Sequence, residues 1–176
     1  MDMRRAPRKL DSEKLWDYAL RILAQRPNSS SELKKKLSRR VDSTASVTTV
    51  LEKLREYGLA DDVKFSEAFA TARLQNKGFG RSRVLRDLRA KQIAPRIAQD
   101  AVEKTFAGMD ETELAKRFLE RRYRGKDLAQ LLAEEKSLAA AYRKLRMAGF
   151  SGNATISALR SYSKHATELQ DLPGDE

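Results

Sequence analysis

Several residue types that define catalytic or covalently stapled proteins are absent from this sequence or nearly so. It contains no cysteine and a single histidine, His165, among 176 residues. The lack of cysteine excludes disulfide frameworks, thiolate zinc sites and cysteine nucleophiles. One histidine excludes multi-histidine metal sites and disfavours a Ser-His-Asp triad. We therefore expect a chain that is not an enzyme and that holds no metal and no cofactor.

Long apolar segments are also missing. No stretch approaches the roughly 18 uninterrupted apolar residues of a membrane-spanning helix. Residues 1–10 are basic, and no apolar run of the kind found in a secretion signal follows them. We expect a soluble, cytoplasmic protein without a secretion signal, and neither a membrane nor a small-molecule substrate among its partners.

Positive charge is abundant instead. Lys and Arg total 36 against 25 Asp and Glu, which gives a formal net charge of +11. Residues 1–10 are net positive and residues 165–176 are net negative, so most of the excess lies in the body of the chain. Such a body attracts a polyanion, which includes nucleic acid, an anionic membrane and an acidic protein surface. Charge alone does not choose among these partners.

The spacing of apolar residues predicts helices throughout. Gly and Pro number only 8 and 4, and between them apolar residues recur three and four positions apart, which favours an all-α protein. A first helix ends before a proline, which disfavours helical backbone in the preceding residue. A second begins at Ser29 and Glu32, at the spacing of a capping box. A third begins at Ser43 or Thr44 and ends at Gly58.

This order of helices recurs further along the chain. An offset of 57 residues aligns two four-residue sets, Arg86, Leu88, Arg89 and Ile93 with Arg143, Leu145, Arg146 and Phe150. The predicted segments are a basic N-terminal tail 1–12, helical repeats 13–60, 61–108 and 109–163 with an insert 124–136, and an acidic C-terminal tail 164–176. Three small helices bury little apolar area alone, so we expect the three three-helix repeats to form a tandem array that is elongated and curved. The alternative is one ordinary helical bundle.

The second helix of each predicted repeat is the basic one. On the helix 81–91, Val84 and Leu88 lie on one side, Arg83 and Arg86 lie opposite, and Arg89 flanks them. The candidate partner-binding or DNA-binding residues are all cationic and comprise Lys34, Lys35, Lys36, Arg73, Lys77, Arg81, Arg83, Arg86, Arg89, Lys91, Arg143, Lys144 and Arg146. A solvated charged face is the alternative for any one of these runs.

Other motifs are better explained by structure than by chemistry. The turn Gly78-Phe79-Gly80 lacks the third glycine and the preceding strand of a nucleotide-binding loop. Asp61-Asp62 can hold a metal ion, but adjacent acids at a helix start are more typical of stabilisation by the helix dipole. Four phenylalanines lie at core spacing, Phe65, Phe69, Phe118 and Phe150, which gives a base-stacking platform little support. The third helices lack the cationic face of a DNA-reading helix-turn-helix.

Several short motifs occur in an order that resembles the RecX family of bacterial recombination regulators. They are Ser31-Glu32-Leu33, Gly58-Leu59 followed by Asp61-Asp62, and Lys77-Gly78-Phe79-Gly80. The resemblance covers most of residues 14–162 and is densest from Leu51 to Ile93. There are two departures, since Ser66 occupies a position where alanine is usual and Gln92 replaces the glycine expected before Ile93.

The resemblance implies a function that the composition alone does not indicate. It implies a non-enzymatic regulator of DNA repair and recombination, connected with the SOS response, that binds the RecA nucleoprotein filament. Binding would inhibit or modulate the recombinase and ATPase activities of RecA, and the DNA phosphate backbone would be contacted as part of the filament. The alternative is a stand-alone, sequence-tolerant DNA-binding protein.

Overall fold

The computed structural model describes residues 11–41 and 43–171, with side chains described to residue 167. Within these ranges the chain is helical and contains no strand, which confirms the predicted all-α class. None of the helices in the described ranges is both long and apolar enough to cross a membrane. Residues 1–10 of the predicted basic tail and residues 172–176 of the predicted acidic tail lie outside the described residues.

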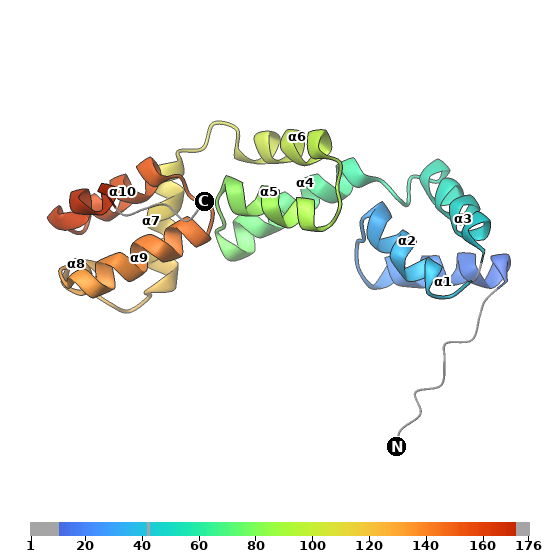
Figure 1. Cartoon of the computed structure of the whole chain (residues 1–176), viewed down its shortest axis with the longest axis horizontal. Helices are drawn as coiled ribbons and strands as arrows, with labels where there is room; N and C mark the ends of the chain where they lie inside the picture. Colours follow the sequence, from blue (N-terminus) through green and yellow to red (C-terminus); the bar gives the residue numbers. More distant parts are fainter. Residues whose placement is uncertain (1–10, 42, 172–176) are drawn as a thin grey trace, which may run out of the picture. The chain divides into compact units, whose positions relative to one another are not determined.

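The first repeat consists of three short helices that pack on one another (Figure 1). They are α1 (Ser12–Gln25), α2 (Ser30–Ser38) and α3 (Thr44–Glu56). The predicted capping box of α2 is present, because the Ser29 hydroxyl accepts from the Glu32 amide and the Glu32 carboxylate accepts from the Ser29 amide. Ser43 caps α3, and Gly58 follows that helix with a left-handed φ of 66°.

The second repeat contains a π-helical turn that the apolar spacing did not predict. Its elements are α4 (Asp62–Ala72), the π-helical turn η1 (Arg73–Lys77), α5 (Arg81–Ala90) and α6 (Pro95–Phe106). Gly78 ends the turn with a left-handed φ of 67°. The π-turn directly continues α4 and ends at Gly78, so no following helical segment reveals a shift in the apolar spacing.

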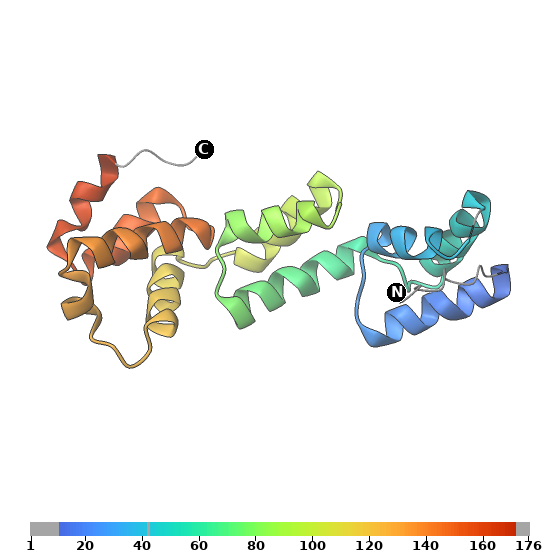
Figure 2. The same ribbon diagram turned by 60° about the horizontal axis from the view of Figure 1, so that its bottom comes forward.

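The third repeat is the longest. It comprises α7 (Glu111–Arg122), α8 (Leu128–Leu132), α9 (Glu135–Met147), α10 (Gly152–Arg160) and the 3-10 helix η2 (Lys164–Asp171). Helix α8 lies in the predicted insert 124–136, although α9 already begins at Glu135. The first part of the predicted C-terminal tail is η2, a short helix at the end of the described chain (Figure 2). It contacts α10, and its Ala166 is buried.

Helices α5 and α9 end with the same hydrogen bonds. In α5 the amides of Gln92 and Ile93 donate to the carbonyls of Arg89 and Leu88. In α9 the corresponding donors are Gly149 and Phe150, and the acceptors are the carbonyls of Arg146 and Leu145. The offset of 57 residues therefore relates equivalent backbone positions. Gln92 adopts a left-handed φ of 58°, so the tight helix end survives the replacement of the expected glycine.

Two compact units divide the chain, and the middle repeat contributes to both. The first extends to Ala68 and includes Leu88–Ala101, and the second contains Phe69–Asp87 and the residues from Val102 onward. The core of the first unit lies among α1, α2 and α3 and includes Leu15, Leu33 and Leu54. The core of the second lies among α7, α8, α9 and α10, with Phe79 packed against it.

Candidate functional site

Two of the candidate arginines pair with a carboxylate within the fold. In the second unit, Arg73 Nε lies 3.2 Å from Asp87 Oδ2 and Arg83 Nε lies 3.1 Å from Asp87 Oδ1. The guanidinium of Arg73 stacks 4.7 Å from the ring centroid of Phe69, and that of Arg83 lies 5.2 Å from the ring centroid of Phe79. Arg83 is therefore half-buried, whereas the helical wheel placed it on the solvent face, because Asp87 and Phe79 hold its side chain against the fold.

Four more candidate cations also make internal contacts. Arg81 Nη2 donates to the carbonyl of Phe106 at 2.8 Å. Lys144 Nζ donates to the Tyr123 hydroxyl at 3.0 Å, and Lys36 Nζ donates to Asn28 Oδ1 at 2.8 Å. The fourth is Lys91, which links two repeats. These internal contacts stabilise the repeats, and they engage the four cations within the fold.

Lys91 belongs to a polar contact between the first two repeats, within the first unit. Its Nζ lies 2.8 Å from Glu32 Oε1, and its carbonyl accepts a hydrogen bond from the Ser29 hydroxyl at 3.1 Å. The Ser31 hydroxyl also hydrogen-bonds to Gln92 Oε1. Partial burial acts to raise the pKa of Glu32, but the hydrogen bonds from Lys91 and from the Ser29 amide outweigh it and hold that pKa below its usual value.

The aspartate pair Asp61-Asp62 serves two helix starts. Asp61 Oδ1 accepts from the amides of Val63 and Lys64 at 2.9 and 3.0 Å, which caps α4. Asp62 Oδ1 accepts from the Ser30 amide at 2.8 Å, at the start of α2. The structure therefore favours the helix-dipole interpretation. Among the described residues, no group of three or more Asp, Glu or His side chains is arranged to hold a metal ion.

The second and third repeats join through backbone hydrogen bonds within the second unit. The Gly80 amide donates to the Ala148 carbonyl at 2.8 Å, and the Ser82 amide donates to the Gly149 carbonyl at 3.2 Å. Gly149 has a φ of 95°, and a Cβ built on it would lie within 3.0 Å of the backbone nitrogen and Cα of Arg83. This junction requires glycine, because the two backbones approach too closely for a side chain.

The remaining candidate cations are exposed to solvent. They lie on α2, α5 and α9 and at the end of η1, and they are Lys34, Lys35, Lys77, Arg86, Arg89, Arg143 and Arg146. Of these, Arg86 Nη2 lies 3.5 Å from the Met147 carbonyl and Arg146 Nη1 donates to the Phe150 carbonyl at 2.8 Å. The second helix of each repeat thus presents cations that can meet phosphate or carboxylate oxygens.

Two exposed apolar side chains escaped the sequence analysis. Tyr57, after α3, is 66% exposed and packs on Trp16 with a ring-centroid distance of 5.8 Å. Met147, at the end of α9, is 67% exposed. The offset of 57 residues pairs Met147 with Ala90 on α5. The sequence contained one signal for Met147, because a large apolar residue occupies a position where the middle repeat has alanine.

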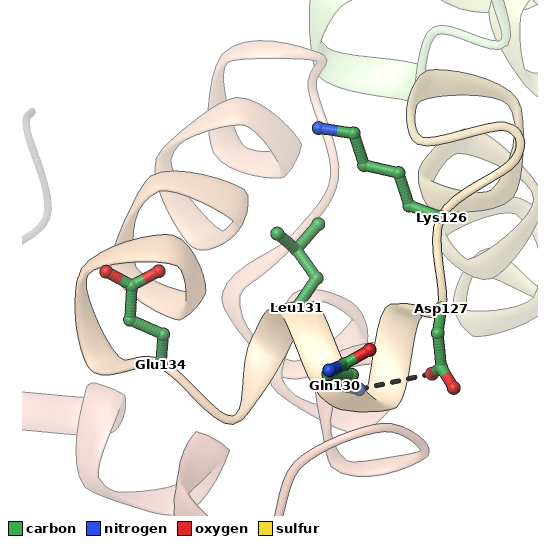
Figure 3. Close-up of a pocket in the computed structure, with 5 residues that line it drawn as sticks. All are labelled: Lys126, Asp127, Gln130, Leu131 and Glu134. Atoms are coloured by element: carbon green, nitrogen blue, oxygen red, sulfur yellow. Dashed lines mark hydrogen bonds between the residues drawn. The ribbon is translucent and has the colours of Figure 1, made fainter.

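A hollow beside α8 does not assemble catalytic groups. It is lined by Lys126, Asp127, Gln130, Leu131 and Glu134 (Figure 3). Asp127 Oδ1 accepts from the Gln130 amide at 3.1 Å, so this carboxylate caps α8 (Figure 3). The other side chains offer mixed charge around a single leucine, which is typical of an ordinary surface depression.

Comparisons with known proteins agree with the repeat architecture. A family model described as the second three-helix domain of RecX matches residues 61–102. The regulatory protein RecX of Halorhodospira halophila is 37% identical over 112 residues, which cover 64% of this chain and 68% of that protein. The regulatory protein RecX of Pelodictyon phaeoclathratiforme is 33% identical over 147 residues, which cover 81% of this chain and 85% of that protein.

Solved structures show the same fold. A crystal structure of regulatory protein RecX matches with a TM-score of 0.67 and 25% identity, over 81% of this chain and 70% of that chain. RecX from Lactobacillus salivarius matches with a TM-score of 0.69 and 18% identity, over 86% of this chain and 96% of that chain, which supports the fold alone. Sequence identity, coverage and fold together place this chain in the RecX family of regulatory proteins.

Proposed function

We propose that this chain binds the RecA nucleoprotein filament in the cytoplasm and inhibits its ATPase and strand-exchange activities. The chain acts by binding, and no step of its action requires catalysis or a cofactor. The observation that carries the proposal is the recurrence of exposed cations on the second helix of every repeat, for example Lys35 on α2, Arg86 on α5 and Arg143 on α9. A filament of protein and DNA offers both carboxylates and phosphates to such a series.

The repeat architecture supports this proposal over a site on one repeat. Each repeat places its cations on an equivalent helix, so successive repeats can contact successive units of a repetitive partner. Half-buried cations such as Arg83 and Lys144 keep the repeats intact, and the exposed ones contact the partner. The RecX relatives are named as regulatory proteins, which fits a role without chemistry.

The decisive experiment compares binding to naked single-stranded DNA and to RecA-coated DNA in the same salt. We expect the filament to be bound much more tightly at physiological salt, and we expect its ATP hydrolysis to slow as the chain is added. Any binding to naked single strands should weaken with salt at a log–log slope of about −0.7 per phosphate contacted. Equal affinity for both would favour the alternative of a stand-alone DNA-binding protein.

A further inference from the structure

The most exposed large apolar side chain of the described residues lies among arginines. Met147 is 67% exposed at the C-terminal end of α9. Arg143 lies one turn earlier on the same helix, on the same face as Met147. Arg146 immediately precedes Met147 in the chain. Arg86 of α5 approaches from the neighbouring repeat, with its Nη2 3.5 Å from the Met147 carbonyl. We call these four residues the Met147 surface, and all four belong to the second unit.

The internal contacts of this surface leave its positive charge available. Arg146 donates to the carbonyl of Phe150 and Arg86 reaches the carbonyl of Met147, so both bond to neutral acceptors. The nearby carboxylate of Asp87 is engaged by Arg73 and Arg83. The Met147 surface therefore combines one apolar side chain with three guanidinium groups whose charges are not neutralised within the surface.

This combination differs from what a DNA phosphate backbone requires. Phosphate binding uses cations and backbone amides, and an exposed aliphatic side chain adds nothing to it. Met and Arg are both enriched at protein–protein interfaces, and the flexible thioether of Met adapts to irregular apolar pockets. At the equivalent position of the middle repeat, α5 carries Ala90, so the large apolar side chain is absent from that repeat.

We propose that the Met147 surface docks on a protein segment that presents an apolar pocket flanked by carboxylates. The inference rests on the proposed function and makes it more specific, because it assigns this part of the chain to the protein subunits of the filament and not to the DNA. Charge complementarity favours this occupant, since three arginines around one methionine match carboxylates around an apolar contact.

Two substitutions of Met147 separate protein from phosphate as the partner. Met147→Ala installs the residue of the middle repeat, and we expect it to weaken binding to RecA-coated DNA about tenfold while naked-DNA binding stays unchanged. Met147→Lys adds a cation at the same place. If the surface contacts phosphate, Met147→Lys should tighten binding both to naked DNA and to RecA-coated DNA. If the surface docks on an apolar protein pocket, Met147→Lys should weaken binding to RecA-coated DNA more than Met147→Ala does.

A matched control uses the other exposed methionine of this unit. Met109, on the connection before α7, is 44% exposed, and Met109→Ala should leave both affinities unchanged. Melting temperatures and circular dichroism of all variants should match the wild type, because both methionine side chains are exposed and neither belongs to a buried core cluster. Met147 variants that bind the filament as the wild type does, or a Met147→Lys variant that binds it more tightly, would overturn the inference and leave the proposed function standing. A wild-type chain that shows no preference for the filament would instead refute the proposed function.

Discussion

Replacing Gly149 with alanine should break the junction between the second and third repeats. Gly149 has a φ of 95°, which costs a non-glycine residue about 1–2 kcal/mol. The added Cβ would lie within 3.0 Å of Arg83 backbone atoms, which are held by the hydrogen bond from the Ser82 amide to the Gly149 carbonyl. Overpacking of this kind costs about 1–3 kcal/mol. The two effects together predict a loss of about 2–5 kcal/mol.

Gly108→Ala provides the control, because it isolates the conformational cost. Gly108 has a φ of 68°, but a Cβ built on it meets nothing within 4 Å. We expect this variant to lose only about 1–2 kcal/mol. The measurement is urea unfolding followed by circular dichroism. Trp16 is the one tryptophan and belongs to the first unit, so its fluorescence follows the unfolding of that unit. In both variants we expect the unfolding transition that it reports to match that of the wild type. Equal losses for the two alanines would refute the close approach at Gly149.

Three further predictions test the cations and the contact between the first two repeats. Neutralising Arg86, Arg89 and Arg143 together should abolish filament inhibition and keep the melting temperature near that of the wild type, because exposed charges usually change stability by about 0.5 kcal/mol or less; a folded, fully inhibitory triple variant would contradict the site. Glu32→Gln should lower stability at pH 7, and the difference from the wild type should shrink as pH falls below the ordinary carboxyl pKa of 4.5, because a folded-state pKa below that value contributes stability that protonation removes. Thermal melts at pH 7 and pH 3 measure this difference, and a difference that stays constant would exclude the ion pair as its cause. Gln92→Gly should be more stable than Gln92→Ala by about 1 kcal/mol in urea titrations, because only glycine adopts a φ of 58° without strain; the reverse order would mean that this helix end relaxes.

Local chemistry along the chain was enough to predict the helices and their repetition. The capping box of Ser29 and Glu32, the cap of α3 at Ser43 and the left-handed end at Gly58 all occur where the sequence places them. Each depends on residues within one turn of one another, so it is encoded in neighbouring positions. The offset of 57 residues also follows from the sequence alone, and the matching hydrogen bonds at the ends of α5 and α9 agree with it.

Only the tertiary structure decided which cations are paired within the fold. In the sequence Lys91 and Arg89 are equivalent members of one basic helix, but Lys91 is paired with Glu32, which lies far away along the chain. Arg83 has the same charge as Arg86, but Asp87 and Phe79 hold it against the fold. The spacing of apolar residues likewise does not indicate that Gly149 lies close to Arg83. Pairing, burial and close approach depend on residues that folding brings together from different repeats, and no local pattern contains that information.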